Sequence, residues 1–407
     1  MDVDNLTSGK WHGAAVALVC GSLILFFSLG IRHTFGLFLQ PVTLGQEWGR
    51  ETFAFAIALQ NLIWGASQPF TGMISDRFGA KPVIAGGAIL YGLGLWVMSQ
   101  VAGEVIFTLG AGVLIGLGLS GTTFPVIFGA ISRLVEPQQR SLAMGVTMSV
   151  ASFGQFAMLP IGLGLMTGLG WQGALIVLSL LALAMFPLAF GIRKAQAPVL
   201  STGEDVSFTQ ALRDAFGTRD FWLLSLGFFV CGFQVVFIAV HLPAFLADEG
   251  IVSGVAMTVL ALIGLVNIAG TYYAGLWGGR HRKPMLLSWI YLGRAVVIST
   301  FVLLPVTSTT AYIFGALMGL FWLSTVPLTN GTVAAIWGVK HLSMLGGIVF
   351  FAHQLGSFVG VWMGGWLYDR TDSYDVAWGV AIVLSLIAAG INWPITERTI
   401  AQREPAA

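Results

Sequence analysis

Arg32 and Arg294 each lie within an apolar stretch of membrane-spanning length that contains no carboxylate. A charged side chain at the centre of a bilayer costs at least about 2.5–3.5 kcal/mol, even on the most lenient insertion scale. Such a cation must be surrounded by backbone carbonyls, polar side chains, water or a bound anion. The two arginines therefore indicate an electropositive interior, and the small ligand that suits this interior best is an anion.

Three histidines lie in similar apolar surroundings: His33 beside Arg32, then His241, and then His353, which Gln354 follows. Histidine is the side chain whose charge changes most readily near neutral pH. Because no carboxylate lies well within an apolar stretch, we expect His353 to carry a coupling proton. The alternatives are that the proton travels on the substrate or that exchange needs none. His241 is expected to be a hydrogen-bond anchor between helices.

Uncharged polar residues complete the candidate binding site. The predicted substrate contacts are Arg32, His33, His353 and Gln354, together with four amides in apolar stretches: Asn61, Gln155, Asn267 and Asn330. Interhelical hydrogen bonds explain such amides as often as ligand contacts do. The aromatic residues Tyr272, Tyr273 and Trp322 are further candidates for the wall of a pocket.

The composition places the chain among membrane proteins. Hydrophobic residues make up 56% of the sequence and charged residues only 9%, whereas a soluble domain has about 25% charged residues. The net charge of +1 argues against nucleic acid as a partner. Cys20 and Cys231 lie in apolar stretches without metal-ligand spacing, so we expect both to be packing residues. No nucleophile–base pair, metal cluster or cofactor motif is present, so an enzyme is not expected.

Twelve apolar segments carry these residues, and each is long enough to cross roughly 30 Å of hydrocarbon. The predicted spans are 13–39, 53–75, 82–101, 105–132, 141–166, 171–192, 221–246, 254–278, 285–304, 310–339, 342–368 and 376–395. A polar stretch separates the sixth span from the seventh. The sequence therefore predicts an all-α membrane protein with an N-terminal six-helix bundle (1–192), a cytoplasmic linker (193–220) and a C-terminal six-helix bundle (221–407).

Two short charged loops show that the halves are related. The loop at residues 72–82 has the pattern Gly-x-x-x-Asp-Arg-x-Gly-x-Lys-Pro, and the loop at 275–284 keeps the leading Gly, the Arg and the closing Lys-Pro. Gly279 stands in the second loop where the first has Asp76. The sequence Ile-Val-Leu-Ser-Leu also occurs in both halves, at 176–180 and 382–386. A duplicated six-helix unit is typical of a parallel-repeat transporter.

The 72–82 loop resembles the signature loop of the major facilitator superfamily, and the likeness covers nearly the whole chain. This resemblance implies two pseudo-symmetric six-helix bundles that rock about a central site bordered by spans one and eleven. It implies that Asp76 and Arg77 help to close the cytoplasmic side. Span nine is usually peripheral in the superfamily, so Arg294 is expected to be a packing or gating residue. Arg32 is expected to contact the substrate, with snorkelling towards Glu47 or Glu51 as the alternative.

Within the superfamily, two segments resemble the monocarboxylate-porter and oxalate/formate-antiporter branch: residues 28–38 of span one and 48–52 at the start of span two. That branch carries Asp-x-x-x-Arg on span eight, where this chain has Asn267 and Thr271. The resemblance therefore implies that the usual anion-binding arginine is absent, and Arg32 is the candidate for its role.

Basic residues predict the orientation in the membrane, because they concentrate in cytoplasmic loops. Of the nineteen Lys and Arg residues, Arg32 and Arg294 lie within spans, Arg50 and Arg370 lie in outer loops, and the remaining fifteen lie in tails or inner loops. We therefore expect both termini to be cytoplasmic and the protein to lie in a bacterial-type plasma membrane.

The sequence predicts an alternating-access transporter of a small organic anion that is either proton-coupled or an exchanger. Its expected partners are the anion, protons and the lipid bilayer, and a monomer is expected to be functional. One alternative is an exporter of amphipathic or drug-like molecules that uses Trp322 and neighbouring aromatic residues. The other is a membrane substrate sensor that does not transport.

Overall fold

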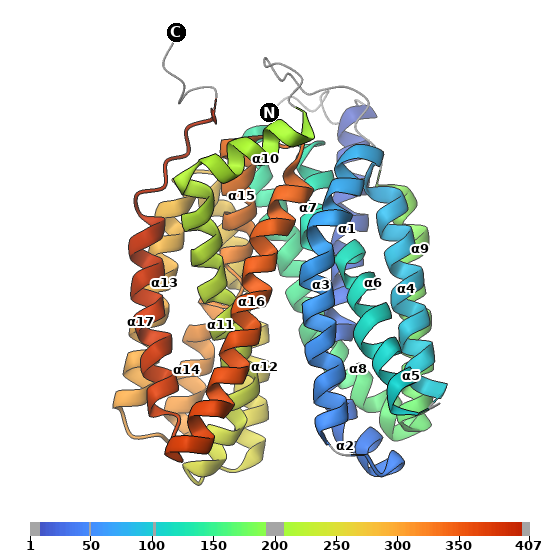
Figure 1. Ribbon diagram of the computed structural model, residues 1–407, viewed down its shortest axis with the longest axis vertical. Coiled ribbons are helices and arrows are strands. Elements are labelled where there is room, and N and C mark those ends of the chain that lie inside the picture. The colour runs from blue at the N-terminus through green and yellow to red at the C-terminus, as the bar shows by residue number, and fades with distance from the viewer. Residues whose placement is uncertain (1–8, 49, 101–102, 193–206, 401–407) are drawn as a thin grey trace. The chain divides into compact units, whose positions relative to one another are not determined.

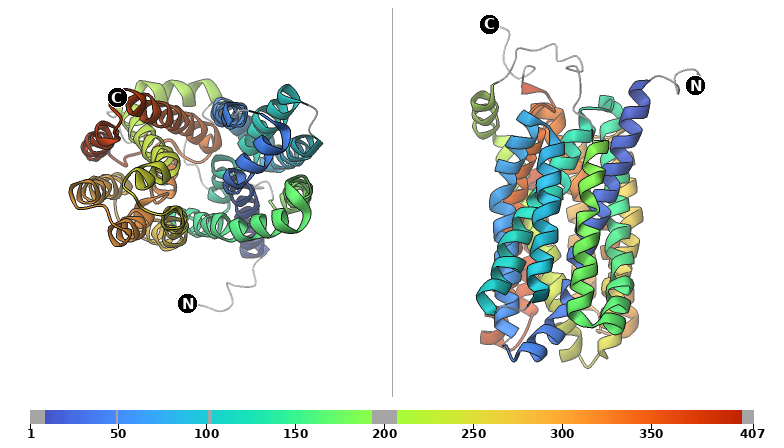
Figure 2. Two further views of the ribbon diagram at one scale, coloured as in Figure 1. Left: turned by 90° about the horizontal axis from the view of Figure 1, so that it is seen from below. Right: turned by 90° about the vertical axis from the view of Figure 1, so that its right-hand side faces the viewer.

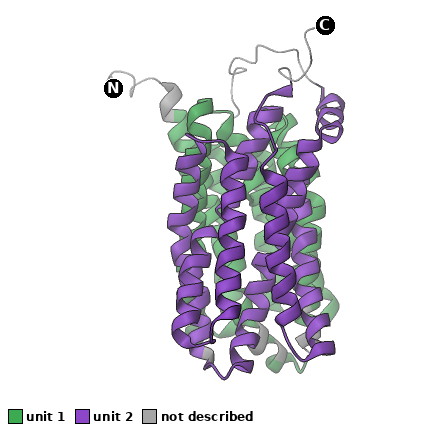
Figure 3. Ribbon diagram, turned by 90° about the vertical axis from the view of Figure 1, so that its left-hand side faces the viewer, with its two compact units in different colours: residues 1–206, 339–347 green, residues 207–338, 348–407 purple. Residues whose placement is uncertain are grey.

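The computed structural model describes residues 9–48, 50–100, 103–192 and 207–400, and every regular element in these ranges is a helix (Figure 1). Backbone contacts divide the chain into two compact units (Figure 3). Unit 1 comprises residues 1–206 and 339–347, and unit 2 comprises residues 207–338 and 348–407. The long helices within each unit run side by side, and Figure 2 shows them end-on in its left view.

The helices of unit 1 follow the chain in order. Helix α8 packs against α1 and α4, and α6 packs against α4 and α3. Their bounds are α1 Gly9–His33, α2 Phe35–Gln46, α3 Arg50–Phe78, α4 Ala80–Gln100, α5 Glu104–Thr108, a π-helix Leu109–Leu114, α6 Ile115–Thr122, α7 Phe124–Ser132, a 3₁₀ turn Pro137–Gln139, α8 Arg140–Leu183, α9 Met185–Leu188 and a 3₁₀ turn Ala189–Gly191.

Unit 2 is built mainly from long helices, among which α12 packs against α14 and α17 packs against α11 and α13. The bounds are α10 Phe208–Gly217, α11 Arg219–Asp248, α12 Ser253–Gly278, α13 Lys283–Leu303, α14 Ser308–Phe321, α15 Thr325–Trp337, α16 Leu342–Thr371 and α17 Asp375–Asn392. The first residues of α16 belong to unit 1, since residues 339–347 cluster with it. Of the predicted linker 193–220, residues 193–206 lie outside the described residues and the rest form α10 and the start of α11.

The prediction of an all-α membrane fold is confirmed. Ten segments of the described residues are long and apolar enough to cross a membrane. One of them, Pro137–Gly191, covers both the fifth and the sixth predicted spans. The 29-residue helix α3, which carries the second predicted span, is not among the ten, because amides and charges lower its hydropathy. Counting the long segment as two and adding α3 gives the twelve predicted spans.

Several predicted spans are not single straight helices, and local chemistry explains each break. The first span is interrupted at Thr34, whose hydroxyl donates to the Ile31 carbonyl at 2.8 Å and competes with the backbone ladder. The fourth span breaks at Thr123, directly before the Phe124-Pro125 start of α7, because proline cannot donate a helical hydrogen bond. The fifth and sixth spans join at Gly170, where φ is +69°.

Glycines allow the first and fifth spans of each unit to touch backbone to backbone. In unit 1, a Cβ built at Gly30 would lie 2.8 Å from the Gly154 carbonyl oxygen of α8. In unit 2, Cβ atoms built at Gly356 and Gly360 of α16 would overlap the carbonyls of Phe229 and Phe233 of α11. Such small-residue contacts bring membrane helices close together. They also fix the level at which polar side chains on the paired helices meet.

Candidate functional site

Arg32 lies in the last turn of α1, immediately before the break at Thr34. Its Nη2 atom donates to Oδ1 of Asn61 on α3 at 3.2 Å. The Nε atom of Arg32 is buried and has no hydrogen-bond partner among the described residues. Neither of the two ion pairs among the described residues includes Arg32. Unit 1 therefore holds a partly buried guanidinium with donors still available.

Two of the other predicted contacts differ in their relation to Arg32. Gln155 directly follows Gly154, which packs against Phe26 and Gly30 of α1, so Gln155 lies on the helix beside α1 at a level that precedes Arg32. His33 is next to Arg32 in sequence, but its side chain is exposed, because successive helical residues point about 100° apart. The structure thus brings Asn61 to the guanidinium and leaves the His33 side chain exposed.

Arg294 of α13 is fully buried and ties together the break in the tenth span. Its Nη2 atom donates to the Phe321 carbonyl at 2.7 Å and to the Trp322 carbonyl at 2.5 Å, and its Nε atom also donates to Phe321. Its Nη1 atom donates to Oε1 of Gln234 at 3.1 Å. The last carbonyls of a helix lack partners within the helix, so Arg294 caps α14. This geometry fits a packing role, which is one of the two roles, packing or gating, expected for Arg294.

The amides predicted in the second half have structural partners in unit 2. Oδ1 of Asn267 on α12 accepts a hydrogen bond from the backbone amide of Leu323, 2.9 Å away in the break between α14 and α15. Nδ2 of Asn330 donates to the Val326 carbonyl, while its buried Oδ1 has no partner among the described residues. Gln354 is buried on α16 near Ser357. Asn267 therefore stabilises the helix break.

His353 lies in an aromatic and sulfur-containing environment. Its ring is 4.8 Å from the ring of Phe228 and stacks on Phe350 at 5.4 Å. The thiol of Cys231 lies 3.5 Å from Nη2 of Arg294 and 3.1 Å from the Thr325 hydroxyl, and the next residue, Gly232, packs against the His353 carbonyl. The sequence predicts a packing role for Cys231, whereas the structure places it in a polar cluster. Its spacing from Arg294 along the chain gave no signal of this contact.

Asp76 at the end of α3 makes the best-formed charged contact of unit 1. Its carboxylate lies 2.7 Å from Nη1 of Arg133 and accepts hydrogen bonds from the backbone amides of Ser343 at 3.3 Å and Met344 at 2.8 Å. These amides begin α16, where an anion is favoured by the exposed N–H groups. Arg77 instead is exposed beside the ring of Phe78. Arg133 is a partner that the sequence did not indicate, because it lies 57 residues away from Asp76.

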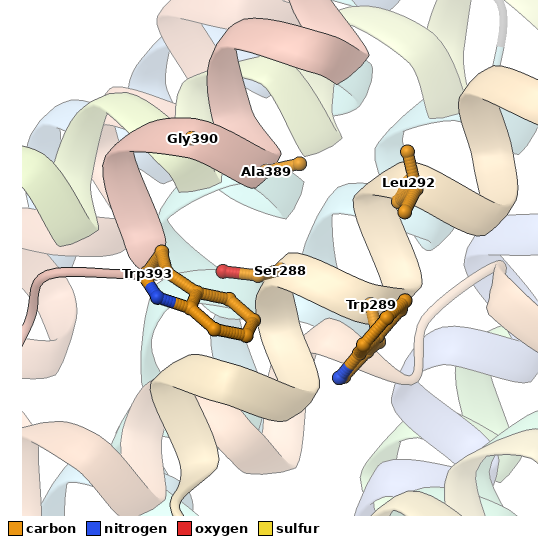
Figure 4. Close-up of a pocket in the computed structure, with 6 residues that line it drawn as sticks. All are labelled: Ser288, Trp289, Leu292, Ala389, Gly390 and Trp393. Atoms are coloured by element: carbon orange, nitrogen blue, oxygen red, sulfur yellow. The ribbon is translucent and has the colours of Figure 1, made fainter.

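The three aromatic candidates for the wall of a pocket differ in exposure. Trp322 is buried within the hydrophobic core of unit 2, whereas Tyr272 and Tyr273 are exposed. A shallow apolar groove lies between α13 and α17 (Figure 4), and none of the candidate site residues lines it. Its lining residues are Ser288, Trp289, Leu292, Ala389, Gly390 and Trp393. No group of three metal-ligating His, Cys, Asp or Glu side chains is found in the described ranges.

Comparison with known proteins decides the family. The family model described as "Major Facilitator Superfamily" matches residues 18–330. The chain belongs to the major facilitator superfamily. This major facilitator protein also matches the fucose:proton symporter of E. coli with a TM-score of 0.71 over 93% of this chain and 97% of that one. The identity is 16%, so this likeness concerns the fold alone.

Relatives agree with the branch that the sequence predicts. Monocarboxylate transporter 13 of Bos taurus is 26% identical over 391 residues, covering 94% of this chain and 89% of the relative. The oxalate:formate antiporter of Oxalobacter formigenes is 23% identical over 386 residues, covering 93% and 89%. The predicted relation to this branch of the major facilitator superfamily is therefore confirmed. In this major facilitator protein, Asn267 and Thr271 of span eight are buried, and the Thr271 hydroxyl donates to the Asn267 carbonyl at 2.9 Å.

Proposed function

We propose that this major facilitator protein transports a small organic anion by alternating access, with Arg32 as the principal charge contact. The observation that carries this proposal is the guanidinium at the break of the first span, with a buried Nε donor and no carboxylate partner among the described residues. A guanidinium offers five N–H donors in a planar fork that matches a carboxylate. An incoming carboxylate would supply both the missing charge and the missing acceptors.

Asn61 and Gln155 are the proposed neutral contacts around this charge. Asn61 already orients the guanidinium through its side-chain oxygen and donates its own Nδ2 to the Ile57 carbonyl at 3.1 Å. Gln155 is half-buried on α8, the helix that packs against α1. Amide groups of this kind fix the orientation of a small ligand without adding charge. The names of the two relatives, a monocarboxylate transporter and an oxalate:formate antiporter, support a small carboxylate as the ligand class.

Coupling and location complete the proposal. Transport is driven by protons or proceeds as exchange, in a bacterial plasma membrane with both termini in the cytoplasm. Asp76 and Arg133 bind the start of α16 and help to keep the cytoplasmic side closed. Arg294 stabilises the break in the tenth span. The exporter alternative loses support because Trp322, its main aromatic candidate, is buried in the core.

The test is titration of the purified protein with formate, oxalate and lactate, read as ligand-induced thermal stabilisation. A charge-assisted hydrogen bond contributes roughly 1.5–3 kcal/mol, so Arg32→Ala should weaken binding by about one to two orders of magnitude. Arg32→Lys should restore only part of the affinity, because an ammonium lacks the bidentate fork. Arg370→Ala removes an exposed arginine beside Trp366 and is the matched control.

Flux measurements in vesicles then separate the alternatives. Uptake of the stabilising anion by the wild type, and its loss in Arg32→Ala, would support transport. Binding without flux would favour a sensor. A well-folded Arg32→Ala protein with unchanged anion affinity, or stabilisation by cationic amphiphiles instead of carboxylates, would exclude the anion site and favour an exporter.

A further inference from the structure

Three chemically active side chains meet in the interior of unit 2, although they come from three different helices. Cys231 lies on α11, Arg294 on α13 and His353 on α16. Cys231 and Arg294 are completely buried, and only 8% of His353 is exposed. A buried charge without a counter-charge is strongly unfavourable, and no ion pair in the described ranges involves Arg294. The charge of the Arg294 guanidinium must therefore be balanced by the polar groups around it.

The Cys231 thiol is the one group near Arg294 that can gain a negative charge under mild conditions. The other acceptors of the guanidinium are the carbonyls of Phe321 and Trp322 and the side-chain oxygen of Gln234, which cannot ionise. Nη2 of Arg294 is 3.5 Å from the sulfur. A thiolate is favoured beside arginine and histidine side chains. The Thr325 hydroxyl, 3.1 Å from the sulfur, can donate a further hydrogen bond.

His353 supplies the group that can exchange a proton with this sulfur. Its backbone packs directly against Gly232, the residue after Cys231, and its buried Nδ1 atom has no hydrogen-bond partner among the described residues. The rings of Phe228 and Phe350 hold the imidazole on two sides. The charged or titratable side chains packed around Cys231 are thus Arg294 of α13, which lies over the Tyr291 ring, and His353 of α16, with the Thr325 hydroxyl of α15 beside the sulfur.

We propose that Cys231 and His353 form a proton-binding pair whose thiolate is balanced by the guanidinium of Arg294. On loading, a proton forms an S–H bond on the thiolate. On unloading, the S–H bond breaks, its electron pair stays on sulfur, and the proton passes to a ring nitrogen of His353, which then releases it. No electrons are transferred and no oxidant is needed. The assignment deepens the proposed function and rests on it in one respect, since this proton would be the one coupled to anion transport.

The chain contains only two cysteines, so the protonation state of Cys231 can be observed directly. In a Cys20→Ser protein the infrared S–H stretching band reports Cys231 alone. We expect this band to be lost as the pH of the purified protein is raised from about 5 to about 9, a range that brackets the ordinary titration of histidine and of thiols. A Cys231→Ser protein, whose one thiol is Cys20, provides the reference band.

Two further variants test whether the three residues act together. His353→Gln and Arg294→Lys, each made in the Cys20→Ser background, should shift the pH at which the band is lost. Both substitutions keep a polar side chain, and gel filtration establishes that the proteins are folded. An S–H band of constant intensity over the whole pH range, or one whose titration is the same in His353→Gln, would overturn the proposal.

Transport measurements with the same proteins keep this proposal separate from the proposed function. Cys231→Ser should abolish accumulation of the anion driven by a pH gradient while leaving anion exchange intact, whereas Cys20→Ser should affect neither. A titrating band in a protein that moves no anion would support the proton pair and refute anion transport. Unchanged pH-driven accumulation in Cys231→Ser would refute the coupling role and leave anion transport standing.

Discussion

Trp64 and Asn267 occupy matching positions in the two halves, each eight residues before the leading glycine of its charged loop, and each is bonded to a break in a helix. Nε1 of Trp64 donates to the Thr123 hydroxyl at 3.1 Å, where the fourth span breaks. Oδ1 of Asn267 accepts from the Leu323 amide at 2.9 Å, where the tenth span breaks. The duplicated units thus keep the same broken helix but stabilise it with different chemistry.

Replacing Asn267 with Leu should lower the thermal stability of the purified protein. The substitution leaves the partly buried Leu323 amide without its acceptor, and an unsatisfied buried polar group costs about 1–3 kcal/mol. The measurement is thermal unfolding in detergent. Thr258→Ala is the control on the same helix, because the exposed Thr258 hydroxyl donates to the Gly254 carbonyl of its own turn. Equal stability of the two variants would contradict the role of Asn267 in the break.

Arg294→Lys should reduce the yield of folded protein more than it reduces anion affinity. A lysine ammonium cannot reach the Phe321 and Trp322 carbonyls and the Gln234 oxygen in the fixed directions of a guanidinium. Folded yield is measured by gel filtration and affinity by anion titration of the folded fraction. Arg280→Lys, at an exposed position of the preceding loop, should behave as the wild type. Normal yield with a large loss of affinity would instead place Arg294 in the binding site.

Hydropathy and the charged loops predicted the class, the twelve spans and the family, because crossing a bilayer imposes a minimum length of apolar sequence. The breaks at Thr123 and near Trp322 were not predicted, since the sequence remains apolar through them, although Pro125 and Pro327 follow closely. The Cys231 cluster was missed because a thiol in an apolar span has the same sequence signal as a packing residue. Contacts between helices far apart in sequence, such as Asp76 with Arg133, have no local signal at all.

Asn61→Asp should suppress anion binding at least as strongly as Arg32→Ala. The new carboxylate would lie where Asn61 Oδ1 now accepts from Arg32 at 3.2 Å, and would neutralise the guanidinium from within the chain. Charge pairs at this separation attract by about 5 kcal/mol at an effective dielectric constant of 20. Asn61→Leu keeps the positive charge unneutralised and should lose much less affinity. Strong anion binding by a folded Asn61→Asp protein would show that the ligand is held elsewhere.

Asp76 and Arg133 should show thermodynamic coupling in a double-mutant cycle. Asp76→Asn and Arg133→Gln should each destabilise the protein, and the double variant should lose less than the sum, with a coupling of roughly 0.5–3 kcal/mol. Only 2% of the Asp76 side chain is exposed and its contact with Arg133 is short. Arg77→Gln should change stability little, because Arg77 is exposed. If the destabilisations of the two single variants simply add in the double variant, Asp76 and Arg133 do not stabilise the protein as a pair.

The carbonyls at the helix breaks also bear on which cations this protein can use. In other transporters, unwound backbone carbonyls coordinate sodium. Here the Ser120 carbonyl accepts from Gln68 at 2.8 Å and from Thr71 at 3.0 Å, and the Phe321 and Trp322 carbonyls accept from Arg294. A sodium ion at the break in the tenth span would have to displace the Arg294 guanidinium and would still lie close to its positive charge. Replacing sodium with potassium in the external medium should therefore leave the rate of uptake unchanged.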